Sequence, residues 1–432
     1  MPGFDVLWPD QDRFRYRGWA AEGPKRYLAG AIVVGTIDQV LLSSLMVGHA
    51  HLRATALLRH LLVVDEVHAS DVYMTRILES VLARHVRAGG HALLLSATLA
   101  AEARQRLLLA ATSQPRSLTL EESVSAPYPM VSSRNATSTA IDVFAVTHDG
   151  RARSATVELS ATMEDPPSVA ARAAAAARAG AKVLVLRNTV ADCVATQLEV
   201  EAQLSEPALL FACGGRPAPH HGRFARDDRQ ALDVALEQRL GKERPDGGCV
   251  VVATQTVQQS LDIDADLLIT DLCPIDVLLQ RIGRLHRHLR RRPAGIEVPL
   301  VIVLVPESRD LTALVGKGGR PRNHHGLGSV YQDLRVLEAT WSTLEQERTW
   351  RIPAMSRELV ERCLHSASLA ATVERLGPAF REHEQYLLGE PSATVASRSS
   401  TSWTGTSPTP TWSSRAPSTR GSRPGSERAT GG

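Results

Sequence analysis

The chain has 432 residues, 43% hydrophobic and 22% charged, which excludes wholesale disorder and predicts two or three domains with buried cores. Its 49 basic and 46 acidic residues nearly balance, so any basic surface for a partner must be local. Aromatic residues make up only 4% of the chain, which argues against a binding surface built mainly from stacked rings.

Seven short apolar runs predict the strands. They are rich in Val, Ile and Leu without polar alternation, which is typical of strands buried on both faces of a parallel sheet. Helix-like stretches such as residues 70–88 and 169–179 lie between them, and this order predicts α/β layers. In chain order the runs are Ala31–Thr36, Leu61–Glu66, Ala92–Thr98, Lys182–Thr189, Cys249–Gln255, Leu267–Asp271 and Leu300–Val305.

The runs form two groups, before residue 100 and after residue 180, so we expect two α/β lobes. The first lobe is predicted at residues 1–111 and the second at 168–306, with a hairpin insertion and linker at 112–167 between them. Residues 307–391 are predicted to form a helical segment, with helices near 329–347 and 356–363.

The last segment, residues 392–432, differs in composition from the rest. Nearly half of it is Ser or Thr, and Leu, Ile, Phe, Met and Tyr are absent. Such a segment buries too little apolar surface to offset its ordering entropy, so we predict a disordered tail. Translation out of frame and a natural flexible tail both fit the abrupt change at Pro391.

Two acids, Asp65 and Glu66, follow the second apolar run. The carboxyl ends of buried strands carry ligand sites in α/β sheets. Asp65 could hold Mg²⁺ through water on nucleotide phosphates, and Glu66 could polarise the attacking water. His68 is placed to sense the phosphate or to couple it to the second lobe. The alternative is that both acids only cap the next helix.

The third run ends in Ser96-Ala97-Thr98. The hydroxyls of Ser96 and Thr98 could bond to the acids of the neighbouring strand and link hydrolysis to movement of the lobes. An ordinary turn formed by a Ser or Thr side chain explains the tripeptide equally simply.

The most specific stretch runs from Gln280 to Arg287, with the sequence QRIGRLHR. Arg284 and Arg287 stand three residues apart, so they can share one helix face and reach a γ-phosphate as arginine fingers. A basic, solvated helix end is the alternative, because Arg290, Arg291 and Arg292 continue the charge. That alternative does not explain the Gln and the Gly.

Two further strand ends carry polar groups suited to nucleic-acid phosphates. Thr254 follows the Cys249–Gln255 run, and Gly35, Thr36 and Gln39 lie at the end of the first run. Backbone amides and hydroxyls at such places can bind a phosphate of a nucleic-acid backbone.

Taken in order, these stretches resemble the motifs of superfamily 2 helicases: VGTIDQ (motif Ib), DEVH (II), SAT (III), ATQTVQQSLDID (V) and QRIGRLHRH (VI). The wording is closest to the CRISPR-associated helicase of type I interference systems, over roughly residues 4–365. The resemblance implies two RecA-like lobes, ATP and Mg²⁺ as cofactors, and translocation on single-stranded DNA. The expected partner is an RNA-guided CRISPR surveillance complex.

The resemblance also carries roles onto residues of this chain. The catalytic set is Asp65, Glu66, His68, Ser96, Thr98, Gln280, Arg284 and Arg287, with Asp65 on Mg²⁺ through water. Nucleotide binding is expected of Asp262, Gln280, Arg281, Gly283, Arg284 and Arg287. Nucleic-acid binding is expected of Gly35, Thr36, Gln39, Thr254 and Arg223, the last from the stretch HGRF.

The sequence departs from the family in its phosphate-binding loop. It contains no GxxxxGK[ST], since Gly241-Lys242 precedes Glu243 and Gly316-Lys317 precedes Gly318. We therefore expect a truncated first lobe. The nuclease domain of the family, which carries paired His and Asp metal ligands, is also not expected, and the lone HDG at 148–150 is predicted to be a turn. The competing hypothesis is an inactive remnant that only binds single-stranded nucleic acid. A separate chain supplying the loop and the nuclease is a further possibility.

The cysteines and the apolar runs bear on the compartment. The five cysteines are widely scattered and form no CxxC, so we interpret them as reduced thiols of a cytoplasmic protein. No apolar run approaches the roughly 20 residues of a membrane span. The first residues lack the order of a signal peptide, so no membrane association is expected.

Overall fold

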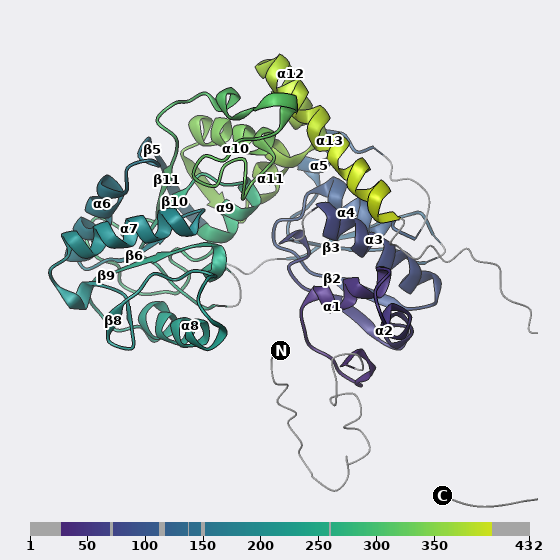
Figure 1. Ribbon diagram of the computed structural model, residues 1–432, viewed down its shortest axis with the longest axis horizontal. Helices are drawn as coiled ribbons and strands as arrows, with labels where there is room; N and C mark the ends of the chain where they lie inside the picture. Colours follow the sequence, from purple (N-terminus) through teal and green to yellow (C-terminus); the bar gives the residue numbers. More distant parts are fainter. Residues whose placement is uncertain are drawn as a thin grey trace, which may run out of the picture.

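The computed structural model describes residues 27–69, 72–111, 117–136, 138–147, 152–258 and 261–399. Two α/β lobes stand side by side, and helices α9 to α13 lie above and between them in the view of Figure 1. Within these ranges no helix has the length and apolar character needed to cross a membrane. The predicted turn at 148–150 lies outside the described residues.

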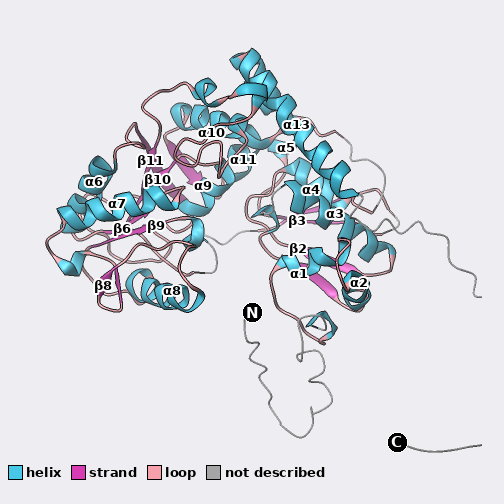
Figure 2. Ribbon diagram, viewed as in Figure 1, coloured by secondary structure: helices cyan, strands magenta, loops and turns pink. Residues whose placement is uncertain are grey.

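The second lobe is built on a six-stranded sheet in the order β12-β5-β11-β10-β6-β9. Its strands pair in parallel except β12, which runs antiparallel to β5 at one edge. Four of the predicted apolar runs form β6, β9, β10 and β11 of this sheet (Figure 2), with β9 at its other edge. Their side chains are almost all buried, as expected of strands covered on both faces. The strands are β5 (Arg153–Ser160), β6 (Lys182–Leu186), β9 (Cys249–Ala253), β10 (Leu267–Asp271), β11 (Leu300–Leu304) and β12 (Thr349–Ile352).

Helices cover this sheet, and local signals set where they begin. Asp165 caps α6 by accepting a bond from Ser168 N at 3.1 Å, and Thr189 caps α7 through Asp192 N at 3.0 Å. Four alanines of α6 are buried where the helix packs against α7 and the sheet: Ala170, Ala173, Ala174 and Ala177. The helices of this lobe are α6 (Pro166–Arg178), α7 (Val190–Gln203), α8 (Arg226–Leu240) and α9 (Ile275–Ile282), and β7 (Ala212–Cys213) and β8 (Arg216–Pro217) form a small hairpin.

The described part of the first lobe has a two-stranded parallel sheet, β1 with β2. Leu62 and Val64 of β1 pack on helix α3, whereas Leu61 and Val63 on the opposite face are 60% and 51% exposed. One face of this small sheet is therefore uncovered. The elements are β1 (Leu61–Val64), β2 (His91–Leu94), α1 (Ile37–Leu41), α2 (Ala50–Leu57), α3 (Val72–Arg87) and α4 (Ala101–Leu108).

The strand predicted at Ala31–Thr36 does not form, and this prediction is wrong. The backbone there is bent or irregular, and the side chains of Ile32 and Val34 are 90% and 85% exposed. A β-strand is stabilised by its neighbours, and the described sheet of this lobe offers this segment no pairing. Apolar composition alone therefore misled the assignment.

Residues 112–167, interpreted as a hairpin insertion and linker, divide between two structures. Helix α5 (Leu120–Ser125) and the hairpin of β3 (Met130–Ser133) with β4 (Asp142–Ala145) lie in this range. However, β5 also lies in it, and β5 pairs with both β11 and β12 in the second-lobe sheet. The second lobe therefore begins before residue 168.

The helical segment after β11 shares its core with the second lobe, because Trp341, Trp350 and Phe380 belong to the same buried cluster as the sheet. The first lobe has a separate cluster around Leu78 and Val81. The last helix continues to Ser399, past the predicted change at Pro391, and residues 400–432 lie outside the described chain. These helices are α10 (Leu334–Gln346), α11 (Ser356–Leu364), α12 (Ser366–Leu376) and α13 (Pro378–Ser399).

Candidate functional site

The two acids of the first lobe stand at the carboxyl end of β1. Asp65 and Glu66 are both exposed, and Asp65 Oδ1 accepts a hydrogen bond from the Glu66 backbone N–H at 2.9 Å. Glu66 has a left-handed backbone with φ of 50°, which is costly for a residue with a Cβ. The turn thus holds a strained conformation that presents both carboxylates to solvent. A 3₁₀ helix, Val67–Ala69, follows Glu66 directly, so neither acid stands immediately before helix α3.

His68 joins the two lobes. Its Nε2 is 2.5 Å from Gln280 Nε2 on α9, and its Nδ1 is 2.7 Å from Ser96 Oγ. An amide nitrogen can only donate, so Nε2 accepts and the Nδ1–H donates to the hydroxyl. The imidazole is almost wholly buried, with Glu66 3.5 Å away. The structure therefore brings together His68, Ser96 and Gln280 from three predicted motifs.

The Ser96–Thr98 loop is ordered by its own hydroxyl and by a distant tyrosine. Ser96 Oγ accepts from the Thr98 N–H at 3.3 Å, and Tyr128 donates its hydroxyl to Ala97 O at 2.7 Å. Thr98 Oγ1 is buried and has no hydrogen-bond partner among the described residues. Ser96 bonds to His68, but the structure does not place it against the acids as predicted.

Arg284 lies beyond α9, after Gly283. A Cβ at Gly283 would stand 3.0 Å from Gln280 O, so a larger residue would crowd the turn that aims the arginine. Arg284 donates Nη2 to Gln258 O at 2.6 Å, and its buried Nε has no partner among the described residues. The pKa of Arg284 is lowered, mainly by burial and also by the charge of Arg287. The charges of Asp262 and Glu66 offset part of this shift. Glu66 of the first lobe therefore lies within the electrostatic reach of Arg284.

Arg287 has a more exposed setting than Arg284. Its Nε is 2.8 Å from Asp262 Oδ1, and Asp262 is also 3.1 Å from His288. The Arg287 side chain is 39% exposed and Asp262 is 50% exposed, so this pair lies at the rim of the site. Both residues remain candidates for contact with a nucleotide.

Arg281, predicted to bind the nucleotide, has a structural place instead. Its guanidinium is fully buried and donates to Thr270 Oγ1, Asn188 Oδ1 and Tyr331 Oη at 2.5, 3.1 and 3.0 Å. Its Nε has no partner among the described residues, but both terminal nitrogens are held by internal bonds. The side chain is closed off from solvent and cannot reach a ligand without breaking this network. Neighbouring side chains on an α-helix point about 100° apart, so Arg281 lies on the inner face of α9 while Gln280 reaches His68 of the first lobe.

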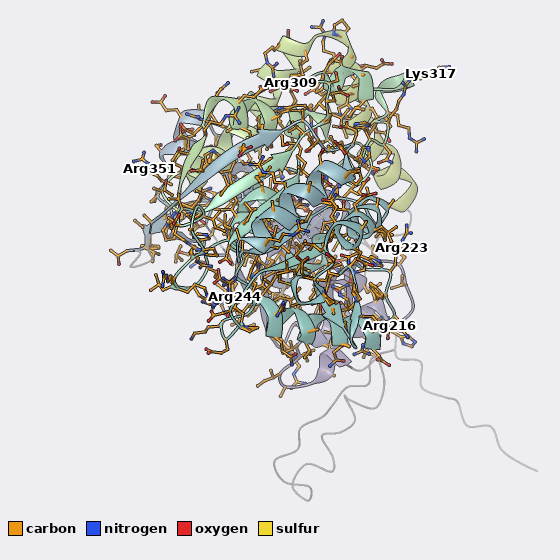
Figure 3. The ribbon with its side chains drawn as sticks, turned by 90° about the vertical axis from the view of Figure 1, so that its left-hand side faces the viewer. Arg216, Arg223, Arg244, Arg309, Lys317 and Arg351 are labelled. Atoms are coloured by element: carbon orange, nitrogen blue, oxygen red, sulfur yellow. The ribbon has the colours of Figure 1, made fainter. Side chains whose placement is uncertain are left out.

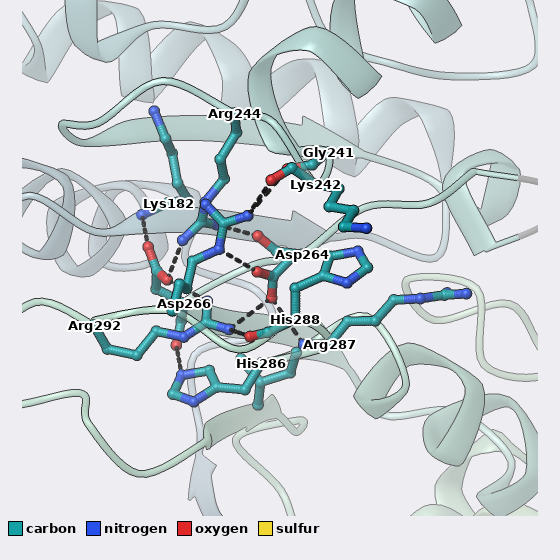
Figure 4. Close-up of polar contacts among 12 residues, drawn as sticks. Lys182, Gly241, Lys242, Arg244, Asp264, Asp266, His286, Arg287, His288 and Arg292 are labelled. Atoms are coloured by element: carbon teal, nitrogen blue, oxygen red, sulfur yellow. Dashed lines mark hydrogen bonds and ion pairs between the residues drawn. The ribbon is translucent and has the colours of Figure 1, made fainter. Parts of the chain in front are cut away.

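A buried ionic network anchors the segment that follows Arg284. Asp264, which is fully buried, accepts from the Arg287 backbone N–H at 2.8 Å. The same carboxylate pairs with Arg292 at 3.0 Å (Figure 4). It also pairs with Arg290 at 2.9 Å. Because a buried carboxylate needs several donors, Asp264 holds the arginine-rich chain against the second lobe.

Asp266 occupies the next inward position of the same network. It accepts from the Lys182 N–H at 2.8 Å and pairs with Arg292 at 2.7 Å and with Arg244 (Figure 4). Burial alone would raise the pKa of the Asp266 carboxyl, but these donors and charges hold it below the ordinary value.

This shift predicts an acid dependence of stability. A carboxyl whose pKa is lower in the folded state stabilises the fold above its unfolded pKa of about 3.9, and loses that contribution as pH falls through the folded pKa. We expect Asp266→Asn to lower the free energy of unfolding at pH 7 and to flatten its decline below about pH 4. Urea unfolding between pH 7 and 3 checks this, with the exposed Asp246→Asn as control. Equal acid slopes in both variants would contradict it.

The predicted nucleic-acid contacts differ in their access. Gly35 and Thr36 are exposed, and Gln39 is half-buried at the start of α1, with its N–H bonded to Thr36 O at 3.2 Å. Arg223 is exposed and lies at the same edge of the second lobe as Arg216 (Figure 3). These positions leave phosphate binding open to test.

Thr254 does not share that access. It is buried, its N–H bonds to His220 O at 2.9 Å, and its hydroxyl lies 3.5 Å from Thr256 Oγ1. Direct contact with nucleic acid is therefore not available to Thr254 in this structure. Its position after β9 is as predicted, but its side chain is buried, with the hydroxyl near that of Thr256.

The residues fit one side of a magnesium–nucleotide complex. Exposed acids at Asp65 and Glu66, a buried Arg284 Nε without a partner and the charged rim of Arg287 suit a cation and a terminal phosphate. Nothing in the described residues supplies a glycine-rich cradle for the other phosphates. Among these residues no three His, Cys, Asp or Glu side chains gather as ligands of a structural metal.

Sequence reasoning missed three residues of this region: Tyr128, Arg357 and Glu361. All three contact the loop that follows β2, although they lie up to about 260 positions away along the chain. The available signals were weak: an aromatic residue in a Pro-rich stretch, and an Arg and a Glu four residues apart on a predicted helix. Neither pattern indicates a tertiary contact by itself.

Residues 179–290 match a family model described as "CRISPR-associated nuclease/helicase Cas3, C-terminal". The chain is 34% identical over 337 residues to the CRISPR-associated endonuclease/helicase Cas3 of Escherichia coli (strain K12), covering 76% of this chain and 35% of that protein. It is 32% identical over 378 residues to the protein of the same description from Thermus thermophilus, covering 78% and 38%. The chain thus spans little more than a third of these relatives.

Solved structures agree with these likenesses. The crystal structure of T. fusca Cas3 superimposes with a TM-score of 0.73 at 27% identity, covering 91% of this chain and 44% of that chain. A chain in a structure described as "CRISPR RNA-guided surveillance complex, pre-nicking" gives a TM-score of 0.69 at 27% identity, covering 90% and 47%. Both likenesses extend over both lobes.

Proposed function

The chain belongs to the Cas3-type family of CRISPR-associated helicases, and on this premise we propose that it forms part of an ATP-driven DNA helicase of antiviral defence. In this proposal the chain supplies the second lobe and the part of the first lobe that carries Asp65 and Glu66. The observation that carries the proposal is the contact of His68 with Ser96 and Gln280, which lie in three stretches that resemble helicase motifs and come from the two lobes.

The proposed chemistry assigns a task to each side of the junction. ATP with Mg²⁺ would supply the reactive phosphoanhydride and a counter-charge for it. Asp65 would hold the cation through water, and Glu66 would orient the attacking water and take its proton. Arg284, with Arg287 at the rim, would neutralise charge that develops on the phosphoryl oxygens. His68 would report the state of the acids to Gln280 on the second lobe.

The proposal requires a phosphate-binding loop from a further segment, whether on the same polypeptide or on a separate chain. The uncovered face of β1 and β2 supports this requirement. One apolar face of the sheet is formed by Leu61 and Val63 on β1, Leu93 on β2 and Leu95 directly after β2. These side chains are 43–60% exposed. Parallel sheets are covered on both faces, so this face fits the remaining layer of the first lobe.

We propose single-stranded DNA as the nucleic-acid ligand and an RNA-guided surveillance complex as the partner. The likeness to a chain in such a complex supports the partner. Exposed Arg223 and the amides around Thr36 support phosphate contacts, which dominate sequence-independent binding. The cytoplasm is the proposed compartment, since all five cysteines are free thiols, four of them buried.

An ATPase assay tests the proposed function. The purified chain alone should show no DNA-stimulated ATP hydrolysis above its Glu66→Gln variant, because the loop's lysine and amides normally share the transition-state charge. Adding a segment that carries GxxxxGK[ST] and covers the β1–β2 face should restore turnover, and Glu66→Gln should abolish it again. Turnover that Glu66→Gln leaves unchanged would contradict the assignment of the acids.

The alternative function is a non-catalytic chain that only binds single-stranded nucleic acid. The lack of a GxxxxGK[ST] sequence is the observation that favours it. The same assay separates the two. Salt-sensitive DNA binding without turnover, even when the loop-bearing segment is bound to the chain, would support the alternative and exclude the enzyme.

A further inference from the structure

Side chains from outside the first lobe hydrogen-bond to the backbone of the loop that follows β2. Arg357 on α11 donates Nη1 to Leu99 O at 3.1 Å, and the Ala101 N–H donates to Glu361 Oε1 at 2.8 Å. Ala100, between them, is 8% exposed and belongs to the core cluster of the second lobe and helical segment. The chain after Ser96 therefore inserts into a neighbouring core.

A third side chain also hydrogen-bonds to the backbone of this loop. Tyr128, beside the β3–β4 hairpin, donates its hydroxyl to Ala97 O at 2.7 Å, and the Arg357 guanidinium lies 5.5 Å from the centre of its ring. Backbone groups of residues 97, 99 and 101 are thus held in succession. These groups lie along a segment that bends at residues 97 and 98 and enters helix α4 at Ala101.

The two α11 side chains that hydrogen-bond to the loop are buried. The Glu361 side chain is fully buried and the Arg357 side chain is 9% exposed, with Arg357 Nη1 3.2 Å from Glu361 Oε1. The same two atoms that pair with each other also bind the loop, so the loop supplies part of the solvation of a buried ion pair. Arg357 Nε and Glu361 Oε2 are buried without a partner among the described residues. Glu358 and Arg362 pair on the same helix but are about two-fifths exposed.

Helix α11 also touches the other side of the junction. It packs against α9, the helix that carries Gln280, while its Arg357 and Glu361 hold the segment that begins with Ser96. Ser96 and Gln280 are the two partners of the His68 imidazole. A single rigid helix therefore contacts the supports of both hydrogen bonds of His68.

We infer that Arg357, Glu361 and Tyr128 are positioning residues, and that α11 is a strut that keeps Ser96 in register with His68. They act through the backbone of residues 97–101 and touch no reacting group. This inference rests on the proposed function for its meaning, because a strut between motif III and motif VI would couple hydrolysis to movement of the lobes. The contacts themselves require neither nucleotide nor DNA.

Hydrogen exchange on the full chain tests these contacts. Glu361→Ala should speed exchange of the Ala101 and Thr98 amides by about tenfold to a hundredfold, since a charge-assisted buried bond is lost. Glu361→Gln keeps an acceptor oxygen for Ala101 and should show a smaller increase. Glu358→Ala is the matched control on the same helix. It should leave these amides, and those of β9, within about twofold of the parent.

A spectroscopic signature tests the consequence at His68. In the ¹⁵N-histidine-labelled chain, with the His68 signals assigned by His68→Gln, Glu361→Ala should move the Nδ1 resonance as the Ser96 bond loosens. Glu361→Gln should restore most of the parent position. Tyr128→Phe, which keeps the ring beneath Arg357, should speed exchange at Thr98 even if Glu361→Ala fails to fold.

Three outcomes would overturn the inference. One is an equal effect of Glu358→Ala on the loop amides. Another is faster exchange confined to α11 and α12 with an unmoved His68 signal, and the third is no change at Thr98 in Tyr128→Phe. An absence of ATP turnover in the loop-bearing complex would refute the proposed function but leave these measurements unaffected, so the two failures are distinguishable.

Discussion

Replacing Arg284 by alanine should lower DNA-stimulated ATP turnover about a thousandfold when the chain is combined with a loop-bearing segment. Its Nε is buried without a partner among the described residues, and it lies within the electrostatic reach of Glu66 across the lobes. Such a donor stabilises charge that forms only in the transition state. The loss should therefore appear in kcat, with little change in the KM for ATP.

Arg287→Ala is the matched comparison for Arg284→Ala. Arg287 is more exposed and already paired with Asp262 at 2.8 Å, so its removal should cost turnover less. Single-strand affinity without nucleotide, measured by fluorescence anisotropy, should stay within about threefold of the parent in both variants, since one contact among several contributes little. A collapse of DNA affinity with turnover kept would mean that this basic stretch binds DNA.

Replacing Arg187 by methionine should destabilise the second lobe by about 3–5 kcal/mol, because it leaves a buried charge without its partner. Arg187 and Asp271 are both fully buried, with Arg187 Nε 3.0 Å from Asp271 Oδ1. The guanidinium also donates to Thr196 Oγ1 at 2.6 Å and to Met163 O at 2.7 Å. Urea unfolding at pH 7 measures the loss, and Arg178→Met, at an exposed pair with Glu206, is the control.

The pH dependence of this variant gives a second check. Burial raises the pKa of Asp271 above its ordinary value, even though Arg187 lowers it. Without Arg187 the folded pKa should rise further, so the folded state binds more protons than the unfolded state between about pH 4 and that folded pKa. The variant should therefore regain stability as pH falls from 8 toward 5. A loss under 1 kcal/mol, or one independent of pH, would contradict the assignment.

Hydrophobic pattern along the chain was sufficient for the fold class and for six of the seven predicted strands. The runs that became β1, β2, β6, β9, β10 and β11 carry side chains suited to burial between layers, and this property is local. The polar residues after those runs were also local information. Parallel strands end at a common edge, so Asp65, Ser96 and Thr254 could be assigned to strand ends without coordinates.

The hydrophobic pattern gave wrong strand assignments where pairing with a distant strand decides whether a segment forms a strand. Ala31–Thr36 has the composition of a strand but finds no pairing in the described sheet. The segment that became β5 was assigned to a linker, because its alternating residues do not reveal that β11 and β12 flank it. Strand pairing is a long-range property, so composition alone could not assign either segment.

By itself the sequence determined the α/β class, the likeness to CRISPR-associated helicases and the residues that carry the proposed chemistry, because all of these follow from residue type and order. The tertiary structure decided which of those residues face a ligand. It turned Arg281 and Thr254 inward, joined His68 to Gln280, and placed Arg357 and Glu361 against the loop after Ser96. Those outcomes depend on the packing of one lobe against another, and residues that meet across lobes leave no periodic pattern along the chain.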